Sequence, residues 1–174
     1  MGLSHDFERF MNRHPRREGD RRRLMPERAA RNLLDLRATL EDPQSLNFVP
    51  TKSETQLLLA TWNIQHFGSS ERYDESFWYI AEVLSRFDLI AIQEVKQSLH
   101  DLEVVTQLLG PWWRYIVSDV TMGDPGNRER LAYLFDSRKA RFSGLAGEIV
   151  LPAIKDEAGN EYPARQLVRT PYMA

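Results

Sequence analysis

The segment LLLATWNIQHFG, residues 57–68, has the pattern of a buried β-strand, and the other elements can be placed relative to it. It opens with a mostly apolar run, and a glycine ends it. Asn63 lies inside this run, where a primary amide without a hydrogen-bond partner would cost about 1–3 kcal/mol. The amide therefore either bonds to a neighbouring strand or takes part in a functional site.

A second apolar run, DLIAIQEV at residues 88–95, predicts the neighbouring strand. Between the two runs, residues 69–87 predict a helix with Ser70 as its N-cap and with Phe77, Ile80, Ala81 and Leu84 on one face. A strand–helix–strand unit places its two strands side by side, so Asn63 and Glu94 are expected near the carboxyl ends of neighbouring strands, where such sheets usually bind ligands. An ionised Glu94 at the rim of a core needs a cation or strong donors, and oxygen ligands with room for water suit Mg²⁺.

The rest of the chain also alternates between helix and strand signals, which predicts an α+β fold with a mixed sheet backed by helices. One helix is predicted to begin with Pro26 in its first turn and to stop before Pro43, and a linker is expected at residues 44–56. The further elements expected are a helix at residues 98–109 and strands at residues 113–120, 130–137, 140–151 and 164–174.

Residues 1–50 are rich in arginine and are expected to form a helical N-terminal extension and linker, whereas residues 51–174 are expected to carry the main domain. The extension has two interpretations. It is either an accessory arm whose arginines contact phosphates, or a helix that packs its leucines on the main domain. The sequence leaves both open.

The composition is that of a soluble globular protein with one core. The chain has 174 residues, of which 42% are hydrophobic and 28% charged, with a formal net charge of −2. This balance does not indicate nucleic acid, although only the charge near a site decides phosphate binding. The chain has no cysteine, which excludes disulfides and thiolate chemistry. It shows neither a signal peptide nor a membrane-spanning apolar stretch, so a cytoplasmic protein without a membrane partner is expected.

Four motifs, ATWNIQHFG, FDLIAIQEV, GNRERLAYLFD and LVRTP, occur in this order between residues 57 and 174. Together they resemble the N-terminal half of the endonuclease/exonuclease/phosphatase superfamily, and most closely its pancreatic-deoxyribonuclease-like branch. The resemblance implies half of a four-layer α/β/β/α sandwich, in which two sheets pack face to face with helices outside.

The resemblance also implies roles for five residues. Asn63 and Glu94 are expected at the catalytic metal and the scissile phosphate, with Glu94 as the metal-ligating carboxylate. Glu129 matches an acid that orients a catalytic histidine, which would fix the tautomer of that histidine. Arg169 matches an arginine that binds substrate phosphate, and Lys96 falls where this branch carries a DNA-contacting arginine.

The function implied for the complete protein is Mg²⁺-dependent phosphodiester hydrolysis by a nuclease, with DNA as the substrate and Mn²⁺ or Ca²⁺ as alternative metals. The family's catalytic histidines and later motifs do not occur in residues 1–174. The C-terminal half of the domain is therefore expected to be missing, and this chain alone to be inactive. His66 and His100 are not expected to replace those histidines.

Two alternatives remain open on the sequence. The first is a phosphomonoesterase or lipid-headgroup phosphodiesterase of the same superfamily. The second is a non-catalytic nucleic-acid-binding fragment, for which the arginine-rich extension would be the binding element.

Overall fold

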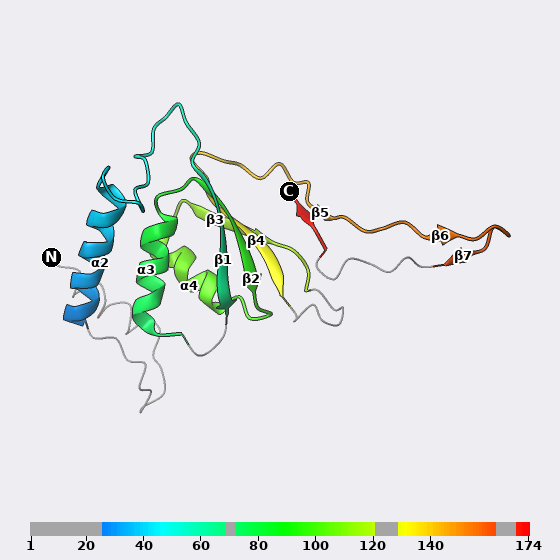
Figure 1. The fold of residues 1–174 in the computed structure, drawn as a ribbon, viewed down its shortest axis with the longest axis horizontal. Helices are drawn as coiled ribbons and strands as arrows, with labels where there is room; N and C mark the ends of the chain where they lie inside the picture. The colour runs from blue at the N-terminus through cyan, green and yellow to red at the C-terminus, as the bar shows by residue number, and fades with distance from the viewer. Residues whose placement is uncertain (1–25, 69–71, 121–128, 163–169) are drawn as a thin grey trace.

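The structure is a computed structural model that describes residues 26–68, 72–120, 129–162 and 170–174 (Figure 1). Its helices and longer strands are, in chain order, α2 (Pro26–Glu41), β1 (Leu59–Phe67), α3 (Asp74–Leu84), β2 (Leu89–Val95), α4 (His100–Leu109), β3 (Trp113–Val117) and β4 (Arg130–Asp136). Four two-residue strands follow, which are β5 (Gly147–Glu148), β6 (Ile154–Lys155), β7 (Glu161–Tyr162) and β8 (Tyr172–Met173).

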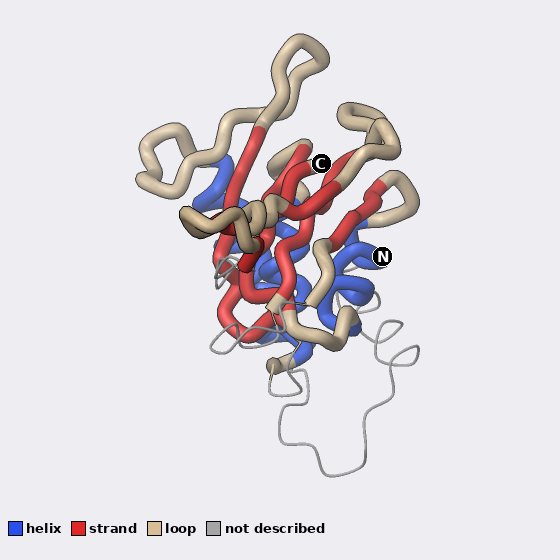
Figure 2. The backbone as a smooth tube through the Cα atoms, turned by 90° about the vertical axis from the view of Figure 1, so that its right-hand side faces the viewer, coloured by secondary structure: helices blue, strands red, loops and turns tan. Residues whose placement is uncertain are grey.

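The four longer strands form one sheet in the order β1-β2-β4-β3. β1 and β2 pair in parallel, whereas β4 is antiparallel to both β2 and β3. The sheet is therefore mixed, and the predicted α+β class is confirmed. The helices lie together on one face of this sheet, and α2 lies outside α3 (Figure 1 and Figure 2). No helix in the described part of the chain is long and apolar enough to cross a membrane.

The hydrophobic core lies between the sheet and the helices α3 and α4. The residues predicted to share one face of α3 are all buried there, because they recur at helical spacing. They are Phe77, Ile80, Ala81 and Leu84. The strand residues Ile90, Ile92 and Leu134 belong to the same cluster and are each 0% exposed. Leu102 and Val105 of α4 also belong to it and are equally buried.

The helix α2 packs against α3 instead of standing apart from the domain. Ala29 and Leu33 are buried against Trp78 and Tyr79 of α3. The apolar stripe of α2 is thus covered by the domain, as the packing interpretation of this helix expects. The arginine-rich residues before Pro26 lie outside the described residues.

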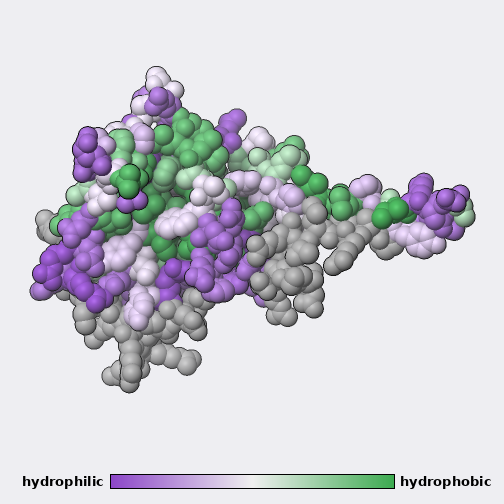
Figure 3. Space-filling view, in the orientation of Figure 1, coloured by the Kyte–Doolittle hydropathy of each residue, from purple (hydrophilic) through white to green (hydrophobic). Residues whose placement is uncertain are grey.

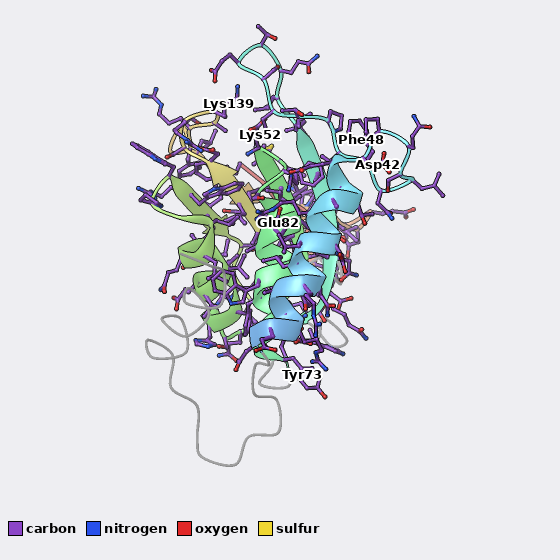
Figure 4. The ribbon with its side chains drawn as sticks, turned by 90° about the vertical axis from the view of Figure 1, so that its left-hand side faces the viewer. Asp42, Phe48, Lys52, Tyr73, Glu82 and Lys139 are labelled. Atoms are coloured by element: carbon purple, nitrogen blue, oxygen red, sulfur yellow. The ribbon has the colours of Figure 1, made fainter. Side chains whose placement is uncertain are left out.

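Ion pairs reinforce the contact between α2 and α3 around Glu82, which Figure 4 labels beside α2. Arg37 of α2 donates to both carboxylate oxygens of Glu82, at 3.1 Å and 2.7 Å. Arg86 also donates to Glu82 and pairs with Glu41 at 2.8 Å. Glu82 is 9% exposed, so this network links the two helices through a buried carboxylate.

Two predicted boundaries need correction. The helix predicted to start near Ser70 begins at Asp74, with Tyr73 at the N-cap position, and Ser70 itself lies outside the described residues. The apolar run 140–151 was predicted as a strand, but only β5 within it is paired, with β8. A strand needs a partner for its backbone groups, and within the described residues no strand pairing other than β5 with β8 includes this run.

The last predicted strand, residues 164–174, is described only from residue 170 onward, where β8 occupies two residues. Tyr172 of β8 lies on the sheet face opposite the helices. Its ring stacks on that of Tyr133 at 5.7 Å, and the Tyr133 hydroxyl donates to the Tyr172 carbonyl at 3.0 Å. The end of the chain therefore covers part of the face that, in the implied sandwich, packs on a second sheet.

Residues 141–162 form an arm that starts beside the sheet, where residues 141–143 line a pocket with Leu89 and Tyr133, and that extends away from the body of the molecule beyond β5 (Figure 1). Figure 3 shows apolar side chains along this arm. The large apolar residues exposed there are Phe142, Leu145, Ile149, Val150, Leu151, Ile154 and Tyr162.

The substitution Glu82→Gln is expected to lower the melting temperature at neutral pH. Burial acts to raise the pKa of the Glu82 carboxyl, but hydrogen bonds from Arg37 and Arg86 outweigh it and hold that pKa below the ordinary value. The ionised carboxylate therefore stabilises the fold above the ordinary glutamate pKa, and this contribution is lost as pH falls through the lowered pKa. Hydrogen bonds to a charged group contribute about 1.5–3 kcal/mol, which corresponds to about 2–4 °C per kcal/mol in a chain of this size.

Thermal unfolding followed by circular dichroism, at neutral pH and at acidic pH below about 4, checks this prediction. The difference between the two proteins should shrink on acidification. Glu103→Gln, which changes an exposed carboxylate on α4, is the control and should have little effect. An equal difference at both pH values would contradict the prediction.

Candidate active site

Asn63 and Glu94 lie next to each other near the carboxyl ends of β1 and β2. The Asn63 side-chain Nδ2 donates to Glu94 Oε1 at 2.8 Å, and the backbone N–H of His66 donates to Glu94 Oε2 at 3.3 Å. The Asn63 side chain is exposed. The amide within the apolar run is thus satisfied by a carboxylate, and the two residues meet as the strand–helix–strand unit predicts.

A backbone irregularity in β2 turns Glu94 out of the core. Alternate residues of a regular strand share one face, so Ile92 and Glu94 would both point toward the helices. Instead Ile92 and Val95 are both 0% exposed, and Glu94 adopts a left-handed backbone conformation with φ 60°. This single residue resets the alternation and leaves the carboxylate at the surface.

β1 has a matching irregularity opposite. The register passes from the pair Asn63–Gln93 to the pair Phe67–Val95, so β1 advances from 63 to 67 while β2 advances only from 93 to 95. His66 also adopts a left-handed conformation, with φ 52°. Such a conformation costs a non-glycine residue about 1–3 kcal/mol and persists only where surrounding contacts hold it. The site is therefore built on strained backbone in both strands.

The electrostatics of the site favour an ionised Glu94. The hydrogen bond from Asn63 and then the one from the His66 backbone N–H hold the pKa of the Glu94 carboxyl below its ordinary value, and the charge of Lys96 acts in the same direction. A partly exposed carboxylate that stays ionised at neutral pH is available to a cation.

Lys96 and Glu129 form an ion pair beside this carboxylate. Lys96 Nζ donates to Glu129 Oε1 at 2.9 Å. The antiparallel register pairs Val95 with Arg130, which brings residues 96 and 129 opposite each other. Glu129 is 7% exposed, so its carboxylate holds the lysine ammonium at the rim of the core.

Gly68 ends β1 at a position that no other residue fits well. Its φ is 109°, and a Cβ added there would lie 2.3 Å from the carbonyl oxygen of Ser98. Its N–H donates to Asp101 Oδ2 at 2.9 Å. Asp101 lies in the first turn of α4 and is 2% exposed. The end of β1 is therefore tied to the loop after β2 and to α4.

The remaining candidate residues are placed as follows. Arg169 lies outside the described residues. His66 lies in β1 next to Glu94, and His100 is the exposed first residue of α4. The backbone contact of His66 and the buried carboxylate of Asp101 were not predicted from the sequence, where the only related signal is the glycine that directly follows the NIQHF run.

The residues present fit part of a metal site. Within the described ranges, no group of three or more His, Cys, Asp or Glu side chains could hold a metal ion. Glu94 and Asn63 nevertheless offer a carboxylate and an amide oxygen at an exposed edge. Mg²⁺ usually keeps several waters and binds through one or two carboxylates together with substrate phosphates, so this pair suits a partial coordination sphere.

A model of the endonuclease/exonuclease/phosphatase family matches residues 60–162. The chain therefore belongs to this family, whose members are hydrolases that generally depend on a divalent metal ion. A deoxyribonuclease from Thioalkalivibrio sp. (strain K90mix) is 31% identical over 101 residues, which cover 56% of this chain. The chain spans 27% of the length of that relative. The family expected from the four motifs is thereby confirmed.

The substitution Gly68→Ala is expected to destabilise the fold. A left-handed conformation alone costs an L-residue about 1–2 kcal/mol, and the close approach to the Ser98 carbonyl adds strain because that atom belongs to the backbone. Gly147→Ala is the matched control, since a Cβ there meets nothing within 4 Å. Thermal unfolding should show a loss of several degrees for the first variant only, and equal melting temperatures would contradict the role assigned to Gly68.

Proposed function

We propose that the protein to which this chain belongs hydrolyses phosphodiester bonds in DNA with the help of Mg²⁺. The observation that carries the proposal is the partly exposed Glu94 carboxylate, kept ionised and held by the Asn63 amide where two parallel strands end. Membership of the family supports hydrolysis, and the name of the similar deoxyribonuclease supports DNA as the substrate.

Residues 51–174 are proposed to form the N-terminal half of a family domain, with residues 1–50 as an extension. The family match to residues 60–162 supports the main part of this division. Activity is therefore assigned to the protein that contains the whole domain, and the residues described above supply one side of its site.

Glu94 is proposed to bind the metal, with Asn63 beside it as a further ligand and as the group that fixes the carboxylate. Mg²⁺ is the preferred ion, and Mn²⁺ or Ca²⁺ are alternatives with the same preference for oxygen ligands. When bound, such an ion neutralises charge that develops on the phosphate. The hydrogen bonds from Asn63 and the His66 backbone preorganise the carboxylate for this task, since both of its oxygens are already oriented.

Lys96, Glu129 and Arg169 are proposed to act on the substrate side of the site. Glu129 holds the Lys96 ammonium in place, where its remaining N–H groups can donate to a phosphate oxygen. A guanidinium such as that of Arg169 can bind two phosphate oxygens at once. Glu129 is also proposed to orient a histidine from the rest of the domain, as its match to the family motif implies.

The substitution Glu94→Gln is expected to abolish most metal-dependent hydrolysis in the protein with its complete domain. The amide keeps the shape of the side chain but loses the charge that binds the cation. A loss of about a hundredfold or more in kcat/KM, equivalent to about 2.7 kcal/mol, should be seen in plasmid nicking at ordinary Mg²⁺ concentration.

The control for this variant is Glu103→Gln, since Glu103 is an exposed carboxylate on α4. Near-normal nicking by the Glu94 variant would overturn the metal assignment. If the unsubstituted protein fails to nick plasmid but releases phosphate from inositol phosphates, DNA is the wrong substrate and the phosphomonoesterase alternative holds.

The substitutions Asn63→Ala and Arg169→Ala are expected to lower activity with little effect on stability. Each removes a contact that is proposed to stabilise the transition state, and every 1.4 kcal/mol lost corresponds to about a tenfold drop in rate. Single-turnover kinetics and thermal unfolding measured together check this. Gln107→Ala, which truncates an exposed amide on α4, is the control. A collapse in melting temperature with full specific activity would show that these side chains are structural.

A further inference from the structure

An ion pair between Arg72 and Asp101 contacts the end of β1. Asp101, buried in the first turn of α4, accepts a hydrogen bond from the Gly68 N–H at 2.9 Å, and the same oxygen lies 3.4 Å from Nε of Arg72. Arg72 precedes α3 and is mostly buried, with 19% of its side chain exposed. The pair therefore links the residues just before α3 and the start of α4 to the end of β1.

Arg72 contacts β1 on both sides of its left-handed residue. Its Nη2 donates to the Gln65 carbonyl at 2.7 Å, and its guanidinium lies over the Phe67 ring at 5.6 Å. His66, which lies between these two residues, has φ 52° and donates its N–H to Glu94. The backbone that holds the Glu94 carboxylate is thus fixed by contacts to its two neighbours in the chain.

Asp101 is almost completely buried, and its contacts to Gly68 and Arg72 do not involve Asn63 or Glu94. A buried ion pair contributes little net stability compared with apolar packing of the same volume. A pair of this kind, which contacts residues 65, 67 and 68 at the end of an irregular strand, is better suited to specifying backbone geometry.

We infer that Arg72 and Asp101 are positioning residues, which hold the left-handed turn at His66 so that its N–H and the Asn63 amide fix the Glu94 carboxylate. The importance of this geometry for hydrolysis rests on the proposed function of Glu94, but the positioning itself is a property of the fold. Removing a residue that orients a metal ligand typically changes metal affinity by about 10–100-fold.

The test uses residues 1–174 with the variants Arg72→Leu and Arg72→Lys, and measures amide hydrogen exchange by NMR. Arg72→Leu keeps an apolar contact with Phe67 but loses the donor to Gln65. It should accelerate exchange at the His66 and Gly68 amides by about tenfold or more relative to the amides of the β1–β2 ladder. Arg72→Lys keeps one donor and the charge, and should restore much of the protection.

Asp101→Ala is a second variant, which removes the acceptor of the Gly68 N–H and carries the test if Arg72→Leu does not fold. It should also release the Gly68 amide and, through it, the His66 amide. Glu82→Gln is the matched control, because it breaks a comparable network of a buried carboxylate with arginines between α2 and α3. It should lower the melting temperature without a selective effect at residues 65–68.

Mn²⁺ affinity, measured by water-proton relaxation, separates this inference from the proposed function. Weaker Mn²⁺ binding by about tenfold in Arg72→Leu, with the affinity unchanged in Glu82→Gln, supports the positioning role. Folded Arg72 and Asp101 variants that keep the original exchange rates at His66 and Gly68 would overturn it. If the unsubstituted chain binds no Mn²⁺, that result counts against the metal assignment of Glu94, while the exchange rates still decide the positioning role.

Discussion

The parallel ladder between β1 and β2 places the other described elements, because α3 connects these two strands and β4 pairs along the far edge of β2. The same ladder creates a conflict. A strand that buries Ile90 and Ile92 would also bury Glu94 by simple alternation, and an unpaired buried carboxylate is too costly to keep. The left-handed conformation at Glu94 resolves this conflict by turning the carboxylate out while Val95 takes its place in the core.

The features that the sequence predicts well are those set by local pattern. The apolar runs predicted β1 and β2 to within two residues at each end, and helical spacing identified the buried face of α3. The meeting of Asn63 with Glu94 follows from connectivity alone, since two strands joined by a helix lie side by side. Their roles in metal binding and catalysis remain predictions.

The features that the sequence does not predict depend on contacts between distant residues. His66 and Glu94 are not glycines, so nothing local indicates their left-handed conformations. Asp101 is one of two acidic residues on α4, and only the fold brings Gly68 to it. The run 140–151 illustrates the opposite error, because an apolar pattern predicts a strand only where another strand is present to pair with it.

The charges at the site connect the proposed metal to the proposed substrate. Two described cations near this end of β1 and β2, Lys96 and Arg72, are paired with the carboxylates of Glu129 and Asp101 respectively. These pairs are close to neutral, so the ionised Glu94 sets the sign of the charge at this edge. A phosphodiester would be repelled by that charge unless a cation lies between the two anions. A divalent ion on Glu94 would reverse the sign of the charge at this edge. The Glu94 carboxylate repels a phosphodiester when no metal is bound, but through a bound ion it would help to recruit one.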